Sequence, residues 1–410
     1  MRKFIFLVTL LLFSLHMAQA QDLQPLYFEG PVVAFGTSAM DRIVLYDVGV
    51  EGGARRELNF GEGWHYVWDF SPDGCRILFT LSDGINPARL YSARLDGSDM
   101  REMAAYSGNE WWGVWEPDWS ASGIIAFTMQ RYTLKSDGSL ERQYHTAWIN
   151  AAEVLAAGAP AEAQFYSVTG DEHSPQWSPD GEWLAYVSYE RRFPGADVNS
   201  TAEPTPVPPP DTAPPAFNED LLLREGDLWV VSVDGASKYR LTYFDVGSVR
   251  APRWSPDGEL ISFTYSPSPN NDQFWMIANQ AGAIPTQLSQ IWSLILDSTW
   301  LPDSSAILGS ARDFRQVESN RLWTIPLVGV ADENGALYLN DVSGAPSMDY
   351  ADYPRFSADG RWLALRSAYQ LMVVDTQTLA WGYADGGLIG NTPPVWTPAA
   401  FAGEAACYAG

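Results

Sequence analysis

The chain has 410 residues, of which 46% are hydrophobic and 18% are charged; this length is too great for one ordinary core but normal for a ring of repeats. With 25 Lys and Arg against 50 Asp and Glu, the net charge is −25. Such acidity argues against nucleic acid or an anionic membrane as partner, because both need clustered positive charge. A basic or neutral protein, or a neutral glycan, is a more favourable partner electrostatically, although the net negative charge also keeps a protein soluble.

The first residues have the pattern of a secretory signal peptide. Two basic residues precede an apolar run over residues 4–15, and Ala-Gln-Ala, ending at Ala20, fits a small-residue cleavage site. The apolar run is too short for a normal membrane span, and no second one follows. We therefore expect residues 1–20 to be removed and residues 21–410 to be secreted or periplasmic, without membrane insertion.

A turn motif recurs along the rest of the chain. Trp-Ser-Pro-Asp-Gly stands at residues 177–181 and again at residues 254–258. Proline presets φ for a tight turn, aspartate can bond its own backbone, and glycine tolerates positive φ. Looser or truncated copies begin at Phe70, Trp119, Trp300, Phe356 and Trp396. Repeats of this length decide the fold.

Each unit reads as four short strands, named a to d in chain order, with the motif as the a–b turn. The predicted b strands begin at Val32, Arg76, Ile124, Trp183, Leu260, Ala306 and Trp362. Four strands per unit at this spacing predict an all-β fold, a β-propeller of four-stranded blades. The count favours seven blades, with six as the alternative if residues 297–309 or the terminal segments are irregular.

The two ends of the chain complement each other. The b strand at Val32 has no a strand before it, and the a strand ending at Trp396 has no b strand after it. We expect the C-terminal strand to join the N-terminal blade and close the ring, since an open edge invites aggregation. Closure would place Cys75 and Cys407 on adjacent blades, and both a disulfide between them and two free thiols remain open.

One segment does not fit the repeats. Residues 193–217 are rich in proline and cannot sustain a helix or a strand ladder. We expect a disordered insert within one blade, between its b and c strands, so that residues 21–410 form a single propeller domain.

The motif copies, with Asp-Gly turns after several c strands, resemble the repeats of the TolB-type β-propeller family. The match is close at residues 177–181 and 254–258, fair at residues 70–74 and 356–360, and covers most of the chain. The resemblance implies a secreted or periplasmic ring that binds protein partners. The motif residues shape the turns between strands and have no chemical role, so the resemblance bears on the fold more than on the function.

The sequence offers little for metal or covalent chemistry. His65, His145 and His173 form no zinc-type pair, and no Gly-x-Ser-x-Gly elbow or Gly-rich phosphate loop occurs. We therefore predict no metal, no cofactor and no catalytic residue.

Ligand-binding candidates follow from the a strands, which line the centre of a propeller. The residue four positions before each motif aromatic should lie near the mouth of the central channel. Five of these positions carry side chains suited to recognition: Tyr66, Trp115, His173, Arg250 and Asp352. The tryptophans nearer the turns are expected in the core between blades: Trp68, Trp119, Trp177, Trp254 and Trp300.

The loops favour the same face. The b–c connections, such as residues 130–144 and 193–217, are long and variable, whereas the a–b corners are short. Variable loops on a rigid scaffold commonly carry binding sites. The sequence thus predicts a secreted, non-catalytic propeller that binds a protein or peptide through its b–c and d–a loop face.

A glycan-binding protein or a polysaccharide lyase using this face is the alternative. Aromatic rings beside carboxylates can stack on sugars as well as receive the basic end of a peptide. A lyase needs a base and cationic groups, which the three histidines of the acidic mature chain, residues 21–410, supply poorly.

Overall fold

The structure is a computed structural model that describes residues 27–409, except 50–53, 85, 109–110, 135, 137, 139, 167–170, 190–225, 245, 269–270, 290–292, 314–319, 328–335, 340–349 and 391. The predicted signal peptide and the predicted Pro-rich insert lie outside the described residues. Within the described part of the chain, no helix is long and apolar enough to cross a membrane.

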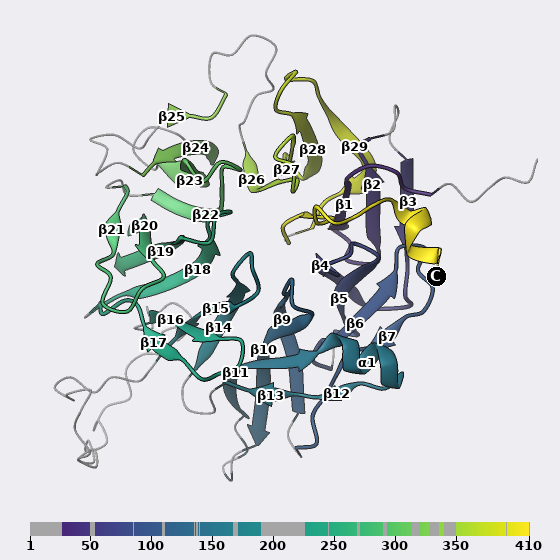
Figure 1. The fold of residues 1–410 in the computed structure, drawn as a ribbon, viewed down its shortest axis with the longest axis horizontal. Coiled ribbons are helices and arrows are strands. Elements are labelled where there is room, and N and C mark those ends of the chain that lie inside the picture. Colours follow the sequence, from purple (N-terminus) through teal and green to yellow (C-terminus); the bar gives the residue numbers. More distant parts are fainter. Residues whose placement is uncertain are drawn as a thin grey trace, which may run out of the picture.

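The chain folds into a seven-bladed β-propeller, with each blade a four-stranded antiparallel sheet (Figure 1). The a strands, nearest the central axis, are β30 (Val395–Trp396), β4 (Trp64–Phe70), β9 (Trp111–Trp119), β14 (Glu172–Trp177), β18 (Ser248–Trp254), β22 (Ser293–Trp300) and β26 (Ala351–Phe356). The b strands are β1 (Val32–Gly36), β5 (Arg76–Ser82), β10 (Ile124–Leu134), β15 (Trp183–Ser188), β19 (Leu260–Ser268), β23 (Ala306–Asp313) and β27 (Trp362–Ser367).

The c strands are β2 (Ile43–Asp47), β6 (Arg89–Arg94), β11 (Leu140–Asn150), β16 (Asp227–Ser232), β20 (Asn271–Ala278), β24 (Arg321–Pro326) and β28 (Gln370–Asp375). The outermost d strands are β3 (Ala54–Leu58), β7 (Arg101–Glu102), β13 (Gln164–Phe165), β17 (Lys238–Arg240), β21 (Thr286–Gln287), β25 (Ala336–Leu337) and β29 (Trp381–Leu388). Blades are numbered 1 to 7 in the order of these lists. The predicted starts of all seven b strands and the predicted ends of all seven a strands are confirmed.

Blade 1 joins the two ends of the chain, as predicted. β30 pairs with β1 through Val33↔Trp396 and Ala34↔Val395. Beyond β30, the 3₁₀ helix η2 (Glu404–Tyr408) carries Cys407, which forms a disulfide with Cys75 at a Cα–Cα distance of 5.4 Å. The closing segment is therefore held to blade 2 as well as to blade 1.

The a–b corners owe their shape to the repeated motif. In blade 4 the Ser178 hydroxyl donates to Asp180 Oδ1 at 2.5 Å and accepts the N–H of Trp183 at 2.9 Å. Gly181 has a φ of 71°, which a side chain would disfavour. Side-chain acceptors thus satisfy the turn's backbone donors, so the corner closes without help from the rest of the blade.

Motif tryptophans pack between neighbouring blades and also connect them. The indole Nε1 of Trp254 donates to the carbonyl of Gln176 in the preceding blade at 2.9 Å, and Trp300 does the same to Arg253 at 2.9 Å. Trp119, Trp177, Trp254 and Trp300 are all buried, as predicted. The prediction for Trp68 is wrong: it is half-buried, because the motif aromatic of its blade is Phe70.

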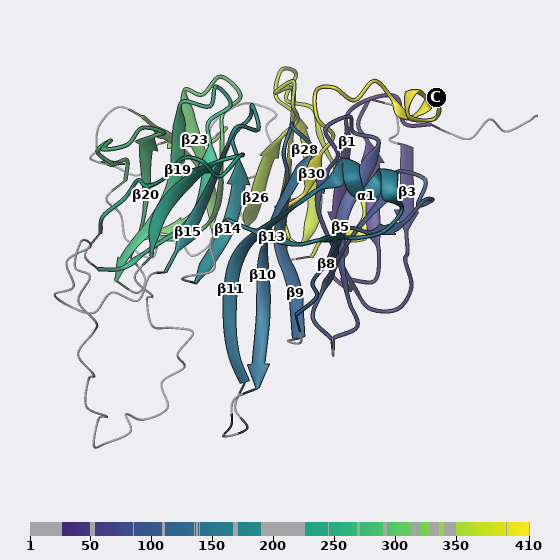
Figure 2. The same ribbon diagram turned by 60° about the horizontal axis from the view of Figure 1, so that its bottom comes forward.

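Blade 3 departs from the predicted regularity. Residues 130–144, predicted to be a loop, largely belong to the long hairpin of β10 and β11, which projects from the ring (Figure 2). Helix α1 (Ala151–Ala157) follows β11, with Asn150 accepting from Ala152 N and Gly158 closing the helix at a φ of 67°. The strands β8 (Ala104–Ala105) and β12 (Ala161–Glu162) form a separate parallel pair.

Candidate functional site

The a strands bend between the mouth of the channel and the corner. In four blades the residue three positions before the motif aromatic has a left-handed backbone: Glu116, Ser174, Ala251 and Tyr353, with φ of 48°, 54°, 50° and 52°. Pairing with the b strand shifts register at the same points. Such bulges re-aim neighbouring side chains, so they decide which residues turn toward the axis.

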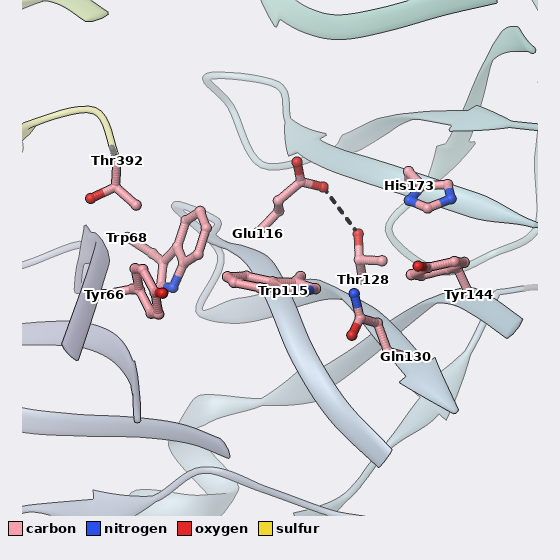
Figure 3. A pocket seen from close by; sticks show the side chains of 9 residues that line it. All are labelled: Tyr66, Trp68, Trp115, Glu116, Thr128, Gln130, Tyr144, His173 and Thr392. Atoms are coloured by element: carbon pink, nitrogen blue, oxygen red, sulfur yellow. Dashed lines mark hydrogen bonds between the residues drawn. The ribbon is translucent and has the colours of Figure 1, made fainter. Parts of the chain in front are cut away.

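A cavity of about 440 Å³, here called the mouth pocket, lies beside the a strands of blades 2 to 4, and Thr392, which precedes β30 of blade 1, also lines it. Nine residues line it (Figure 3): Tyr66, Trp68, Trp115, Glu116, Thr128, Gln130, Tyr144, His173 and Thr392. The lining residues include neither lysine nor arginine. Its size is in the range of small-ligand sites, and its walls are mainly aromatic with a few polar groups.

Three aromatic rings form one wall of the mouth pocket. The Trp115 ring centroid is 5.5 Å from that of Tyr66 and 5.9 Å from that of Trp68, both with edge-to-face geometry. Trp68 occupies a bulge in β4, and its indole donates to Thr80 Oγ1 at 2.9 Å. Burial raises the pKa of Tyr66, which keeps its hydroxyl protonated. These contacts hold the rings in place before any ligand arrives.

A carboxylate faces the aromatic wall from the bulge of β9. Glu116 Oε2 accepts the backbone N–H of Ser174 at 3.0 Å and the Ser174 hydroxyl at 3.1 Å. The Thr128 hydroxyl also lies 3.4 Å from this oxygen. Glu116 therefore links blades 3 and 4 while presenting negative charge to the pocket (Figure 3).

The opposite side of the pocket is formed by His173 and Tyr144. Their ring centroids are 4.3 Å apart, and the Tyr189 ring meets His173 edge-on at 5.1 Å. His173 Nε2 is 3.9 Å from Asp171 Oδ1. This side of the pocket is thus also aromatic, with a titratable group inside it.

The structure brings together three of the five predicted ligand-binding residues and separates the other two. Tyr66, Trp115 and His173 all line the mouth pocket. Arg250 instead forms an ion pair with Asp272, and Asp352 is buried with the Arg366 guanidinium 2.6 Å from its carboxylate. Neither Arg250 nor Asp352 is among the residues that line the pocket.

Six lining residues are not among the five candidates. Thr392 stands four positions before its motif aromatic and Glu116 directly follows Trp115, so the register brings both near the mouth. The other four were not expected there: Trp68, Thr128, Gln130 and Tyr144. Thr128 and Gln130 alternate along β10, and Tyr144 pairs directly with Gln130, so all three share one face of the sheet. Extending the strand pattern through residues 130–144 would have found them. Trp68 carries no such signal, because its bulge depends on the local pairing.

Comparisons with known proteins support the fold rather than an activity. No protein-family model matches the chain. A stretch of 145 residues, 35% of this chain, is 25% identical to the uncharacterized protein Atu1656 of Agrobacterium fabrum. The stretch covers 47% of that protein, so the chain matches about half the length of this relative.

Solved structures similar to this chain include propellers with different roles. TolB from Acinetobacter baumannii is 13% identical, with a TM-score of 0.46, over 90% of this chain and 67% of that one. A prolyl endopeptidase is 12% identical, with a TM-score of 0.52, over 87% of this chain and 50% of that one. Because its identity is this low, the likeness to the prolyl endopeptidase indicates a shared fold alone.

Proposed function

We propose that this protein is a secreted or periplasmic, non-catalytic scaffold that binds a polypeptide at the mouth pocket. The observation that carries the proposal is the aromatic wall of Tyr66, Trp68 and Trp115 facing the carboxylate of Glu116. A cationic side chain is attracted to the faces of tryptophan and tyrosine rings and to a carboxylate beside them. A lysine or arginine of the partner fits this combination.

The charge of the whole chain supports a basic partner. The net charge of −25 would attract a basic segment over long range and raise its rate of association. The Cys75–Cys407 disulfide fits an oxidising compartment outside the cytoplasm. Together with the leader-like residues 1–20, it favours a partner in the cell envelope or outside the cell.

The proposal is tested by screening a displayed peptide library for binding to the mature protein and measuring the best peptide by calorimetry. Trp115→Ala should weaken binding by about 2 kcal/mol or more, about 30-fold in Kd, because buried aromatic anchors dominate such interfaces. Trp381→Ala is the matched control, since Trp381 is 46% exposed on the outer strand β29. Unchanged affinity in Trp115→Ala would reject the mouth pocket as the site.

Charge variants of the selected peptide separate this proposal from the glycan alternative. Replacing its basic residue by norleucine should weaken binding, whereas added neutral oligosaccharide should not compete. Binding of an oligosaccharide that Trp115→Ala abolishes, with no peptide bound, would favour a glycan-binding protein. The lyase alternative is less favoured, because the pocket lining supplies one histidine and neither lysine nor arginine to stabilise an anionic intermediate.

A further inference from the structure

A second cavity opens at the other end of the a strands, on the face formed by the a–b corners. This corner cavity has a volume of about 270 Å³, and its lining includes Asp69, Asp118, Trp119 and Trp177. Turn residues such as Pro179 complete its rim. It shares no lining residue with the mouth pocket, so the two are separate sites.

Two tryptophans in the corner cavity lack the hydrogen bond that their counterparts make. The indole N–H groups of Trp254, Trp300 and Trp396 each donate to a carbonyl of the preceding blade at 2.9 Å. Those of Trp119 and Trp177 have no acceptor among the described residues. The two side chains are only 8% and 7% exposed, and a buried donor without an acceptor is costly.

Two carboxylates stand beside these indoles, one residue before the motif aromatic in blades 2 and 3. Asp69 Oδ2 accepts the backbone N–H of Trp119 at 2.8 Å, and Asp118 Oδ2 accepts that of Trp177 at 2.5 Å. The blades that carry an aspartate at this position are thus followed by the blades whose indoles are unpartnered. An aspartate one position before the motif aromatic thus goes together with an indole N–H in the next blade that has no acceptor in the described part of the structure.

Neither aspartate has a cation as its direct partner within the described part of the chain. The two arginines at the equivalent positions of blades 5 and 7, Arg253 and Arg355, both pair with Asp297, at 3.2 and 2.7 Å. Burial raises the pKa of Asp69 and of Asp118, and the charge of Asp118 raises the pKa of Asp69 further. The charge of Arg253 offsets only part of the rise at Asp118. A positively charged donor placed between them would relieve both desolvation and repulsion.

A fitting ligand must therefore combine a cationic donor with neighbouring hydrogen-bond acceptors. We propose that the corner cavity binds the free amino terminus of a polypeptide. The ammonium group lies between Asp69 and Asp118, and the first carbonyl groups accept from the indoles of Trp119 and Trp177. The cavity is smaller than typical small-ligand sites, which suits one or two terminal residues. Capture of a terminal amine is a known mode of peptide recognition.

The test titrates the full-length mature protein, labelled with ¹⁵N at the indole nitrogens, with the tripeptide Ala-Ala-Ala at millimolar concentration. The indole signals of Trp119 and Trp177 should move downfield on binding, and those of Trp254 and Trp300 should stay. N-acetylated Ala-Ala-Ala, which lacks the ammonium group, should leave all four signals in place. Assignments come from single tryptophan-to-phenylalanine variants.

Asp118→Asn keeps an acceptor for the backbone of Trp177 but removes the charge, and should weaken tripeptide binding about tenfold or more. Trp381→Ala, far from the cavity on β29, should bind as the wild type does. Equal shifts with the acetylated peptide, or shifts with calcium or magnesium chloride but none with the tripeptide, would overturn the proposal. The comparison of free and acetylated peptide uses wild-type protein, so it decides the matter even if a variant does not fold.

Discussion

Removing the Cys75–Cys407 disulfide should destabilise the ring substantially, although both cysteines are only half-buried. The bond joins residues separated by 332 positions, so it closes nearly the whole chain into one loop. The relation between loop length and unfolded-state entropy gives about 6 kcal/mol for a loop of this size, although native disulfides commonly contribute about 2–5 kcal/mol. We expect a loss within that lower range.

Noncovalent contacts also hold the C-terminal segment against the ring in the folded state. The buried Glu404 accepts the N–H of Phe28 at 3.0 Å and returns its own N–H to the Phe28 carbonyl at 2.8 Å. Arg56 adds an ion pair to the same carboxylate at 2.6 Å. These contacts keep the C-terminal segment near blade 1 when the covalent link is cut, so we expect the variants to fold with the ring still closed.

Thermal unfolding of Cys75→Ser, Cys407→Ser and the double variant tests this reasoning. All three should melt at the same temperature, roughly 2–6 °C below the wild type, because each breaks the same bond. The wild type with reductant should match them. Intact mass after alkylation without reductant should show no modified thiol; two modified thiols, or a double variant that melts with the wild type, would refute the argument.

Three further results are expected. Burial lowers the pKa of His145 to about 4, below the unfolded value of about 6.5. The free energy of unfolding should therefore fall as the pH drops through that interval, by at most about 3 kcal/mol. In His145→Leu, the free energy of unfolding measured with urea should depend less on pH across the interval. Trp254→Phe removes a hydrogen bond to a carbonyl, whereas Trp177→Phe removes none to any described residue. Trp254→Phe should therefore lower the free energy of unfolding by about 1 kcal/mol more in the same assay; equal losses would contradict the assigned partners. Burial raises the pKa of Asp69 above its usual range, so stability should decline as the pH rises from about 4 through neutrality. Asp69→Asn should make that decline smaller, leaving the part that Asp118 contributes; an unchanged slope would show that another group is responsible.

The strand pattern could be predicted from the sequence because its signals are local. The corner at Ser178 to Gly181 closes through its own side chains, so the turn chemistry alone marks where β14 ends and β15 begins. Ring closure followed from counting, since the b strand at Val32 needed an a strand and the segment ending at Trp396 needed a b strand. Neither inference required knowledge of distant contacts.

The site was predicted only in part, because its composition depends on contacts between strands. Counting four residues back from the corner correctly grouped Tyr66, Trp115 and His173. The same count could not show that Arg250 pairs with Asp272. Nor could it show that a bulge turns Trp68 away from the core, because bulges depend on how two strands pair.

The closing blade also determines how the chain has to fold. β1 is buried along its whole length, and one of its edges is covered only by the two residue pairs it forms with β30. During synthesis the other strands of that blade emerge long before β30, so β1 presents an unpaired apolar edge until almost the whole chain exists. Such edges recruit strands from other molecules. Aggregation should therefore compete with folding at this last step, and covering β1 until β30 arrives should favour the folded ring.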